Sequence, residues 1–295
     1  MLLLGFAESS TQARAVAEQA GLAYAQIDCH RFPDGESRLS LPTELPTRVA
    51  IYRSLEQANA KLLELFMLSM ALREAGVEQL ILIAPYLCYM RQDRAFAPGE
   101  VVSQRHVGRL LANHFDGLIT VDPHLHRTPQ LQQAVPVNCP ITLHASVAMA
   151  EFLASLPGTP PLLLGPDEES RQWVAEIAAK QGLEFAVANK LRRGDRQVEV
   201  QLPSLDYRGR HVMLVDDVVS SGHTLAEASH ALLHAGAAQV DCLVTHALFA
   251  DGAEALMHAA GVEHIYSTDA IIHPSNKLSL APLLAEALRP LAEAD

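Results

Sequence analysis

Short apolar runs alternate with longer segments of helical period along this chain. The runs are rich in Val, Ile and Leu and cover residues 80–84, 117–121, 161–164, 211–215 and 240–245. Longer segments, such as 62–75 and 225–235, place apolar residues at the spacing of an amphipathic helix. Continuous apolar strands separated by helices are typical of buried, mainly parallel sheets, so the pattern predicts an α/β fold.

An internal similarity links the two halves of the chain. Residues 71–86, ALREAGVEQLILIAPY, align with residues 231–246, ALLHAGAAQVDCLVTH, and each segment has the pattern of a helix end, a glycine and a strand. Two copies of one α/β unit would explain the similarity, although any helix-glycine-strand unit shares this pattern. The length of 295 residues favours two domains. We expect them at residues 1–143 and 144–295, with the last helix free to pack on the first domain.

Composition and charge exclude several classes of protein. A formal charge of −12 disfavours nucleic acid as a partner and favours small anionic ligands, held by local basic groups or backbone amides. Because no uninterrupted apolar stretch of about 18 residues occurs and no basic region precedes the apolar start, neither a membrane span nor a signal peptide is expected. The four cysteines lie far apart without a CxxC pair, which favours reduced thiols and a cytoplasmic location.

The segment VDDVVSSGHT, residues 215–224, carries the strongest chemical signal. Two carboxylates, Asp216 and Asp217, end an apolar strand, and a small polar turn then leads into a helix. The turn consists of Ser220, Ser221, Gly222, His223 and Thr224. Backbone amides at such a helix start form an anion cradle, to which the hydroxyls of Ser221 and Thr224 can add donors.

The two carboxylates can then hold vicinal ribose hydroxyls, at the strand ends where open α/β sheets bind their ligands. The combination favours a phosphoribosyl site over an ordinary strand-to-helix turn with capping residues.

Three other segments carry candidate chemistry. In RFPDGE, Pro33 and Gly35 predict a turn that presents the Phe32 ring and two carboxylates to one side, a set that can stack on adenine and bind its amino group. On the residues alone, this is an ordinary surface turn. RQDR, residues 91–94, offers two guanidiniums for phosphate oxygens or is a solvated loop. NKLRR, residues 189–193, is on the same basis an exposed basic hairpin.

Taken together, these segments resemble the ribose-phosphate pyrophosphokinases, which are related to the phosphoribosyltransferases. The resemblance spans nearly the whole chain, with eight segments in the right order. They are RFPDGE, PYLCYMRQDRAFAPGEVVS, TVDPH, GPDEES, NKLRRGDRQVEV, VDDVVSSGHT, THALF and KLSLAPLLAEAL. The resemblance implies two similar phosphoribosyltransferase-type domains, each a mainly parallel sheet flanked by helices. It also implies an enzyme that transfers the β,γ-diphosphate of MgATP to O1 of ribose 5-phosphate, giving phosphoribosyl pyrophosphate and AMP.

The resemblance implies roles for individual residues as well. The residues implied to bind ATP are Phe32, Asp34, Glu36, Arg91 and Gln92. The residues implied to bind ribose 5-phosphate are Arg192, Asp216, Asp217, Ser220, Ser221, Gly222, His223 and Thr224. Lys190 and Arg192 are the catalytic cations, carried in a flap that also contains Gly194. His124 and Asp167 approach Mg²⁺, for which the oxygen ligand is the better suited of the two.

The resemblance further implies a homo-oligomer, a dimer or higher, in which the ATP site lies near a subunit contact. The segment AFAPGEV is similar to that of archaeal-type members, which implies weak or absent regulation by ADP.

Three residues depart from the family pattern. Ser220 stands where many members have aspartate, and Pro123 stands where leucine is usual, which removes an amide donor near the metal residues. His223 stands where most have glycine and adds bulk beside the expected phosphate. A negative φ at His223 would let its side chain point outward or let the imidazole bind phosphate.

Two alternatives stay open on the sequence. A phosphoribosyltransferase that consumes phosphoribosyl pyrophosphate would share VDDVVSSGHT but would need neither RFPDGE nor the Lys190–Arg192 pair. A non-catalytic regulatory homologue would be expected to have lost these residues, and all of them are intact.

Overall fold

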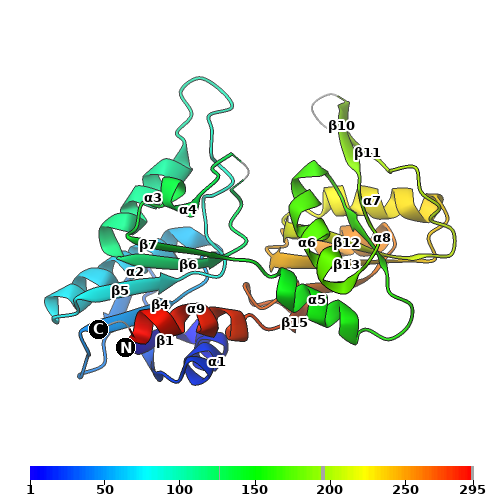
Figure 1. Ribbon diagram of the computed structural model, residues 1–295. Helices are drawn as coiled ribbons and strands as arrows, with labels where there is room; N and C mark the ends of the chain where they lie inside the picture. The colour runs from blue at the N-terminus through cyan, green and yellow to red at the C-terminus, as the bar shows by residue number, and fades with distance from the viewer. Residues whose placement is uncertain (126, 194–196, 294–295) are drawn as a thin grey trace. The chain divides into compact units, whose positions relative to one another are not determined.

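The computed structural model describes residues 1–125, 127–193 and 197–293. Contacts divide the chain into two units (Figure 1). The first comprises Met1–Leu143 and Leu280–Asp295, and the second comprises His144–Ser279. The chain therefore divides between Leu143 and His144, and the last helix, α9 (Ala281–Glu293), belongs to the first unit.

The first unit is built on a seven-stranded sheet in the order β3-β2-β1-β4-β5-β6-β7. Neighbouring strands are parallel, except that β2 and β3 form an antiparallel hairpin. The strands are β1 (Leu2–Phe6), β2 (Ala23–Arg31), β3 (Ser37–Ser40), β4 (Arg48–Tyr52), β5 (Gln79–Ile83), β6 (Gly117–Val121) and β7 (Cys139–Leu143). The helices besides α9 are η1 (Ala7–Ser9), α1 (Ser10–Ala20), α2 (Ala58–Glu74), α3 (Ser103–His114) and α4 (Leu131–Ala134).

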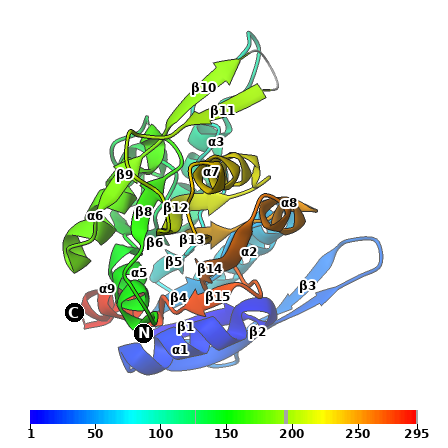
Figure 2. The same ribbon diagram turned by 90° about the vertical axis from the view of Figure 1, so that its right-hand side faces the viewer.

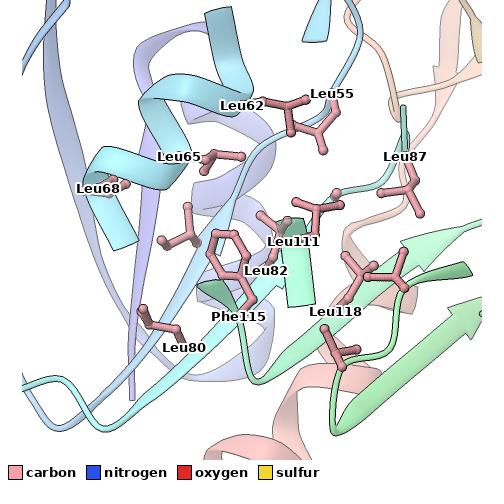
Figure 3. Packing of buried hydrophobic residues seen from close by; sticks show 14 of the residues in the cluster. Leu55, Leu62, Leu65, Leu68, Leu80, Leu82, Leu87, Leu111, Phe115 and Leu118 are labelled. Atoms are coloured by element: carbon pink, nitrogen blue, oxygen red, sulfur yellow. The ribbon is translucent and has the colours of Figure 1, made fainter. Parts of the chain in front are cut away.

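Helices cover both faces of this sheet. On one face, α2 and α3 pack against the strands, and Figure 3 shows Leu62, Leu65 and Leu68 of α2 near Leu80 and Leu82 of β5. On the other face, α1 packs against α9. Because both faces are covered, the central strands β1, β4, β5 and β6 are mostly apolar, which explains why they are nearly continuous apolar runs in the sequence.

The second unit is built on a six-stranded parallel sheet in the order β15-β14-β13-β12-β8-β9. Its strands are β8 (Leu162–Gly165), β9 (Phe185–Val187), β12 (His211–Val219), β13 (Gln239–Ala247), β14 (Val262–Thr268) and β15 (Asn276–Leu278). Its helices are α5 (Ser146–Ser155), η2 (Glu168–Ser170), α6 (Arg171–Gln181), α7 (His223–His234) and α8 (Ala253–Ala259). Helices α7 and α8 contact each other, as do α5 and α6. A separate hairpin of β10 (Asn189–Arg193) and β11 (Gln197–Gln201) extends away from the sheet (Figure 2).

The two units share one strand order. The first sheet contains β2-β1-β4-β5-β6-β7, and the second runs β9-β8-β12-β13-β14-β15, with equivalent strands in equivalent places. The similar sequence segments fall on equivalent elements, the end of α2 with β5 and the end of α7 with β13. In both, a glycine of positive φ, Gly76 (+91°) or Gly236 (+95°), ends the helix. The common order supports two copies of one unit, and the predicted α/β fold with mainly parallel sheets is confirmed.

The described residues also bear on the membrane and cysteine expectations. Among them, no helix has both the length and the apolar character that crossing a membrane requires. All four cysteines carry free thiols, and Cys88 and Cys242 are buried in the cores of the two units.

Gly108 provides a test of the packing of α3. A Cβ at this position would lie 1.8 Å from the carbonyl oxygen of Ala134. Because backbone cannot rotate away as a side chain can, we expect Gly108→Ala to lower the free energy of unfolding by about 3 kcal/mol, the upper end of overpacking costs. Urea unfolding measures the change, with Leu110→Ala on the exposed side of the same helix as the control. An unchanged midpoint for the glycine variant would contradict this packing.

Candidate functional site

The residues predicted from the sequence follow the carboxyl ends of parallel strands in both units. In the second unit, Asp167 follows β8, and Asp216 and Asp217 lie near the end of β12, which leads through the turn 220–224 into α7. In the first unit, the RFPDGE turn follows β2, the RQDR segment follows β5 and His124 follows β6. Most of the predicted residues therefore follow strand ends, the place where open α/β sheets bind ligands, whereas Lys190 and Arg192 belong to the separate β10–β11 hairpin.

The turn between β12 and α7 presents unused backbone donors. Within the described residues, the amides of Ser221, Gly222 and His223 donate no hydrogen bond, and no side chain caps the start of α7. Three backbone hydrogen bonds hold the start of the turn. The amide of Ala250 donates to the Ser220 carbonyl (2.9 Å), and the amides of Leu248 and Phe249 both donate to the Val219 carbonyl (3.1 Å each). Unpaired amides at the positive end of a helix dipole bind phosphate.

Gly222 and His223 occupy this turn without conflict. Gly222 has φ +74°, and a Cβ there would lie 3.1 Å from the Ala253 carbonyl oxygen, so the position requires glycine. His223 is the first residue of α7, is not among the residues of positive φ, and has an exposed side chain. The imidazole therefore does not force the backbone of the turn out of shape. Thr224 is half-buried on the next position of the helix.

Three carboxylates of the second unit influence one another. Burial raises the pKa of Asp216 well above its usual value, and the negative charges of Asp217 and Asp167 raise it further. The amide of Asp217 donates to Asp216 Oδ1 at 3.0 Å, which only partly offsets the effect. Asp167, Asp216 and Asp217 thus form an acidic cluster of the second unit, in which the charges of the other two residues reach Asp216.

The carboxylates of these three residues suit magnesium by their chemistry, but their oxygen atoms do not gather closely enough to hold one ion; among the described residues, Asp241, Glu263 and His264 form the group that does. Mg²⁺ prefers carboxylate oxygens, and a divalent cation would relieve the repulsion among these three groups. His124, whose imidazole is half-buried, belongs to the first unit. The two residues before it, Asp122 and Pro123, are buried, and Asp122 has φ +38°. Nitrogen is a poor match for Mg²⁺, so the donor chemistry favours Asp167.

In the first unit, the RFPDGE turn connects β2 to β3 and is well ordered by its own bonds. The Phe32 amide donates to the Glu36 carbonyl (2.8 Å), the Gly35 amide donates to the Phe32 carbonyl (3.0 Å), and the Glu36 amide donates to Asp34 Oδ1 (3.1 Å). The three side chains predicted to bind adenine, those of Phe32, Asp34 and Glu36, are all exposed. The turn therefore presents an aromatic face and two carboxylates to its surroundings.

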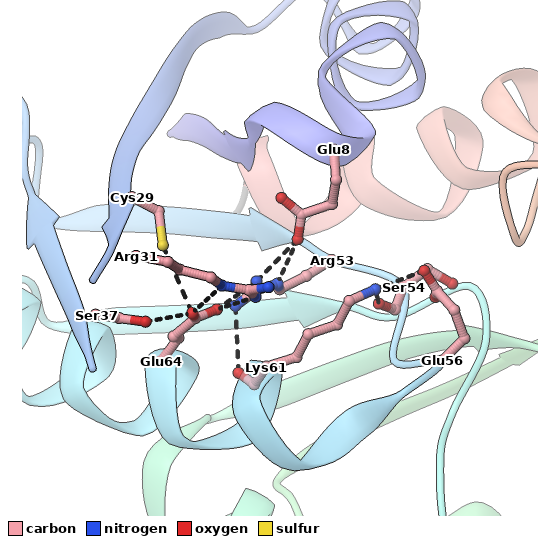
Figure 4. Close-up of polar contacts among 9 residues, drawn as sticks. All are labelled: Glu8, Cys29, Arg31, Ser37, Arg53, Ser54, Glu56, Lys61 and Glu64. Carbon is pink, nitrogen blue, oxygen red and sulfur yellow. Dashed lines mark hydrogen bonds and ion pairs between the residues drawn. The ribbon is translucent and has the colours of Figure 1, made fainter. Parts of the chain in front are cut away.

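A buried carboxylate lies beneath this turn. Glu64 of α2 has a side chain that is 2% exposed and accepts hydrogen bonds from Arg31 Nε (3.0 Å), Arg31 Nη2 (3.2 Å), Ser37 Oγ (2.6 Å) and Arg53 Nη2 (2.5 Å), as Figure 4 shows. Burial alone would raise the pKa of Glu64, but the hydrogen bonds from these three side chains outweigh it and lower the pKa to about 2. Glu64 is consequently a carboxylate at any ordinary pH.

Arg53 completes this buried network. Its side chain is 1% exposed, its guanidinium stacks over Phe6 at 3.6 Å, and its Nε donates to Glu8 Oε1 at 2.9 Å. Close by, Lys61 Nζ donates to Glu56 Oε1 at 2.5 Å (Figure 4). None of the residues in this network was singled out by the sequence analysis. The sequence feature that could have indicated the network is the presence of two charged residues, Lys61 and Glu64, among the apolar residues of α2.

The RQDR segment divides into two kinds of residue. Asp93 is bound by Arg127 Nη1 (3.1 Å), and the guanidinium of Arg94 lies over Phe96 (4.8 Å), so these two residues have local partners. Arg91 is exposed and forms no ion pair with a described residue, and the half-buried Gln92 accepts a backbone bond from Gln104 (3.3 Å). The geometry leaves Arg91 and Gln92 as the candidates for an ATP contact.

The two predicted catalytic cations lie on the β10–β11 hairpin. Lys190 and Arg192 belong to β10, and Lys190 pairs with Val200 in the hairpin register. Their side chains lie outside the described part of the structure, and so does Gly194. Their catalytic role stays a prediction.

Comparisons with known proteins agree with this geometry. The family profile described as the N-terminal domain of ribose phosphate pyrophosphokinase matches residues 1–114, and that of the phosphoribosyl transferase domain matches residues 140–275. A ribose-phosphate pyrophosphokinase of Methanopyrus kandleri is 36% identical over 294 residues, with 99% of this chain and 100% of that protein covered. One of Methanosarcina acetivorans is 31% identical over 293 residues, with 99% and 100% covered.

A solved structure shows the same fold. The crystal structure of phosphoribosylpyrophosphate synthetase from Mycobacterium smegmatis has a TM-score of 0.82 and 23% identity, and the match covers 99% of each chain. The fold and the site thus define a protein of two phosphoribosyltransferase-type units. The chain belongs to the ribose-phosphate pyrophosphokinase family.

Repulsion within the acidic cluster is expected to lower the stability of the folded protein at neutral pH. Because the pKa of Asp216 is raised in the folded protein, the unfolded chain, whose aspartates titrate near pH ~3.9, loses this proton first as the pH rises. Folding stability is therefore lost above that pH. We expect Asp216→Asn to raise the free energy of unfolding at pH 7 by about 1 kcal/mol, a usual size for relief of functional-site strain.

Urea unfolding in EDTA, at several values between pH 4.5 and pH 8, measures this effect. The gain should shrink toward the acid end, and Glu227→Gln, which alters an exposed carboxylate on α7, should produce no such trend. A gain independent of pH, or a loss at pH 7, would show that the carboxylates do not repel one another as described.

Proposed function

We propose that this protein is a ribose-phosphate diphosphokinase, which transfers the β,γ-diphosphate of MgATP to O1 of ribose 5-phosphate and releases phosphoribosyl pyrophosphate and AMP. The observation that carries the proposal is the β12–α7 turn, where three unused backbone amides lie beside paired carboxylates. One end of this arrangement suits a phosphate monoester, and the other suits vicinal hydroxyls. A sugar phosphate with a ribose ring carries both groups.

In this proposal the second unit binds the acceptor. The 5-phosphate lies on the amides of Ser221, Gly222 and His223, with the hydroxyls of Ser220, Ser221 and Thr224 as further donors. Asp216 and Asp217 accept hydrogen bonds from the ring hydroxyls. Because Asp216 is partly desolvated, its bonds to the sugar gain strength from the low local dielectric. The ring is thereby oriented with O1 directed away from the phosphate.

The donor is bound by the first unit. Phe32 stacks on adenine, Asp34 and Glu36 accept from its amino group, and Arg91 and Gln92 bind the phosphates. The exposure of Phe32, at 41%, leaves an aromatic face that a second copy of the chain would shield from water. This supports a homo-oligomer, a dimer or higher, with the ATP turn near the subunit contact.

The chemical step is an in-line displacement at phosphorus. O1 of ribose 5-phosphate forms a bond to the β-phosphorus as its proton is lost, the bond from that phosphorus to the α,β-bridging oxygen breaks, and the electron pair leaves with AMP. Lys190 and Arg192 offset the negative charge that spreads over the β-phosphoryl oxygens, and Arg192 also binds the sugar phosphate. Closure of the hairpin would exclude water, which would otherwise hydrolyse ATP.

Asp167 would hold a magnesium ion, and His124 is the other residue expected to approach Mg²⁺. When bound, Mg²⁺ supplies positive charge that neutralises the phosphates of ATP. The free thiols support a cytoplasmic location. The short segment after RQDR supports weak or absent regulation by ADP.

The proposal is tested by measuring AMP release from MgATP with and without ribose 5-phosphate. AMP should form in step with phosphoribosyl pyrophosphate and only when the sugar phosphate is present. Transfer of a nucleobase without ATP would identify a phosphoribosyltransferase instead, and no turnover at all would identify a non-catalytic homologue.

Lys190 provides a sharper test of the chemical step. We expect Lys190→Ala to lower kcat about 100-fold or more while the Kd for ATP stays nearly constant, because a charge that acts mainly in the transition state affects rate and not ground-state binding. Steady-state kinetics and calorimetric ATP titration measure the two quantities. Lys180→Ala, at a half-exposed ion pair with Glu176 on α6, serves as the control. Equal losses of ATP binding and turnover would contradict the assigned role.

A further inference from the structure

The shared topology identifies the counterpart of the sugar site in the first unit. Gln79 and Gln239 are equivalent in the repeated segment, and the strand registers pair them with Arg48 of β4 and His211 of β12. Five residues further along each strand, Arg53 is therefore the counterpart of Asp216, and Ser54 is the counterpart of Asp217. At the same place in the fold, the first unit has a cation and a hydroxyl where the second unit has two carboxylates.

The charges around the two counterparts are arranged differently. Asp216 has negative neighbours and hydrogen-bonding capacity left for a ligand, whereas Arg53 is enclosed by Glu8 and Glu64, its carboxylate partners on either side. Two cations, Arg31 and Arg53, face two anions, Glu8 and Glu64, so the buried network is neutral. At this edge of the first unit's sheet, Arg53 is therefore fully engaged in ion pairs with Glu8 and Glu64.

Glu64 connects this network to both ends of the RFPDGE turn. Arg31 is the last residue of β2 and Ser37 is the first residue of β3, so the two residues flank the turn 32–36 on either side. Both donate to the same carboxylate, Arg31 through two nitrogens (3.0 and 3.2 Å) and Ser37 through Oγ (2.6 Å). The Glu64 carboxylate thus fixes the end of β2 and the start of β3, the two strand ends that the turn connects.

The carboxylate itself is rigidly placed. Glu64 lies on α2, and Leu62, Leu65 and Leu68 of the same helix are buried in the core of the first unit (Figure 3). A side chain on a packed helix and with all its acceptor positions in use has little freedom to move. Arg31, by contrast, is 55% exposed and would be free to reorient without this partner.

We propose that Glu64 is the positioning residue of the ATP site, which holds the turn bearing Phe32, Asp34 and Glu36 in its binding conformation. The inference rests on the proposed function for the identity of the ligand, and it assigns Glu64 no contact with ATP. A glutamine at position 64 keeps the shape but has one acceptor oxygen, and its NH₂ group would face the donors of Arg31 or Arg53. In either orientation of the amide, Arg31 would lose one of its two hydrogen bonds to position 64 together with the charge of its partner, so its tie to the turn would be weakened.

Hydrogen exchange and kinetics together test the proposal. In Glu64→Gln without substrates, the peptide spanning residues 31–37 should exchange its amides faster than in the wild type. The KM for ATP should rise about tenfold, the lower end of the effect of losing an orienting partner, while the KM for ribose 5-phosphate and the kcat at saturating ATP change little. Ser37→Ala removes the hydrogen bond from Ser37 to Glu64 and leaves the Arg53–Glu64 pair in place. It should show a smaller rise in exchange and in the KM for ATP, and it remains informative if the first variant folds poorly.

The matched control is Glu56→Gln. Glu56 pairs with Lys61 at 2.5 Å close to the same network but touches neither end of the turn, so neither exchange at 31–37 nor the KM for ATP should change. Unchanged exchange in both Glu64→Gln and Ser37→Ala would overturn the proposal, even if the enzyme proves inactive. Faster exchange with an unchanged KM for ATP would also overturn it, because the turn would then not be part of the ATP site. Absence of AMP release by the wild type would refute the proposed function separately.

Discussion

The parallel pairing of β12 with β8 and β13 is the constraint on which the second unit's chemistry depends. Register pairs Leu164 with Leu214, so β8, which ends at Gly165, stops beside the part of β12 that leads into Asp216. Apolar burial on both faces fixes this register. The stability of the buried strands therefore offsets the unfavourable repulsion among the three carboxylates at this edge of the sheet.

The two units use one architecture in opposite ways. In the second unit, the amides of residues 221–223 donate no hydrogen bond to any described residue, which is what an anionic ligand needs. In the first unit, the equivalent edge is neutralised by Arg53 and its two carboxylate partners, and the exposed groups lie further out, on the turn between β2 and β3. A single repeated fold can in this way supply the proposed sugar-phosphate site in one unit and a rigid support for the proposed ATP-binding turn in the other.

Much of the fold could be predicted from the sequence, because strands buried on both faces are continuous apolar runs and glycines of positive φ end the helices before them. The acidic strand end and the small polar turn around Gly222 could also be predicted, because their residues are consecutive in the sequence. The Glu64 network was not, since its partners Arg31, Ser37 and Arg53 are 33, 27 and 11 residues away and only tertiary packing brings them together. The sequence could not decide the effect of His223 either, because that depended on the backbone angle and exposure found at the start of α7.

The most direct measurement is a crystal structure of the protein with ribose 5-phosphate. The account predicts the 5-phosphate within hydrogen-bond distance of the amides of Ser221, Gly222 and His223, with the ring hydroxyls on Asp216 and Asp217. A sugar phosphate bound elsewhere, or one kept out by the imidazole of His223 at saturating concentration, would contradict it.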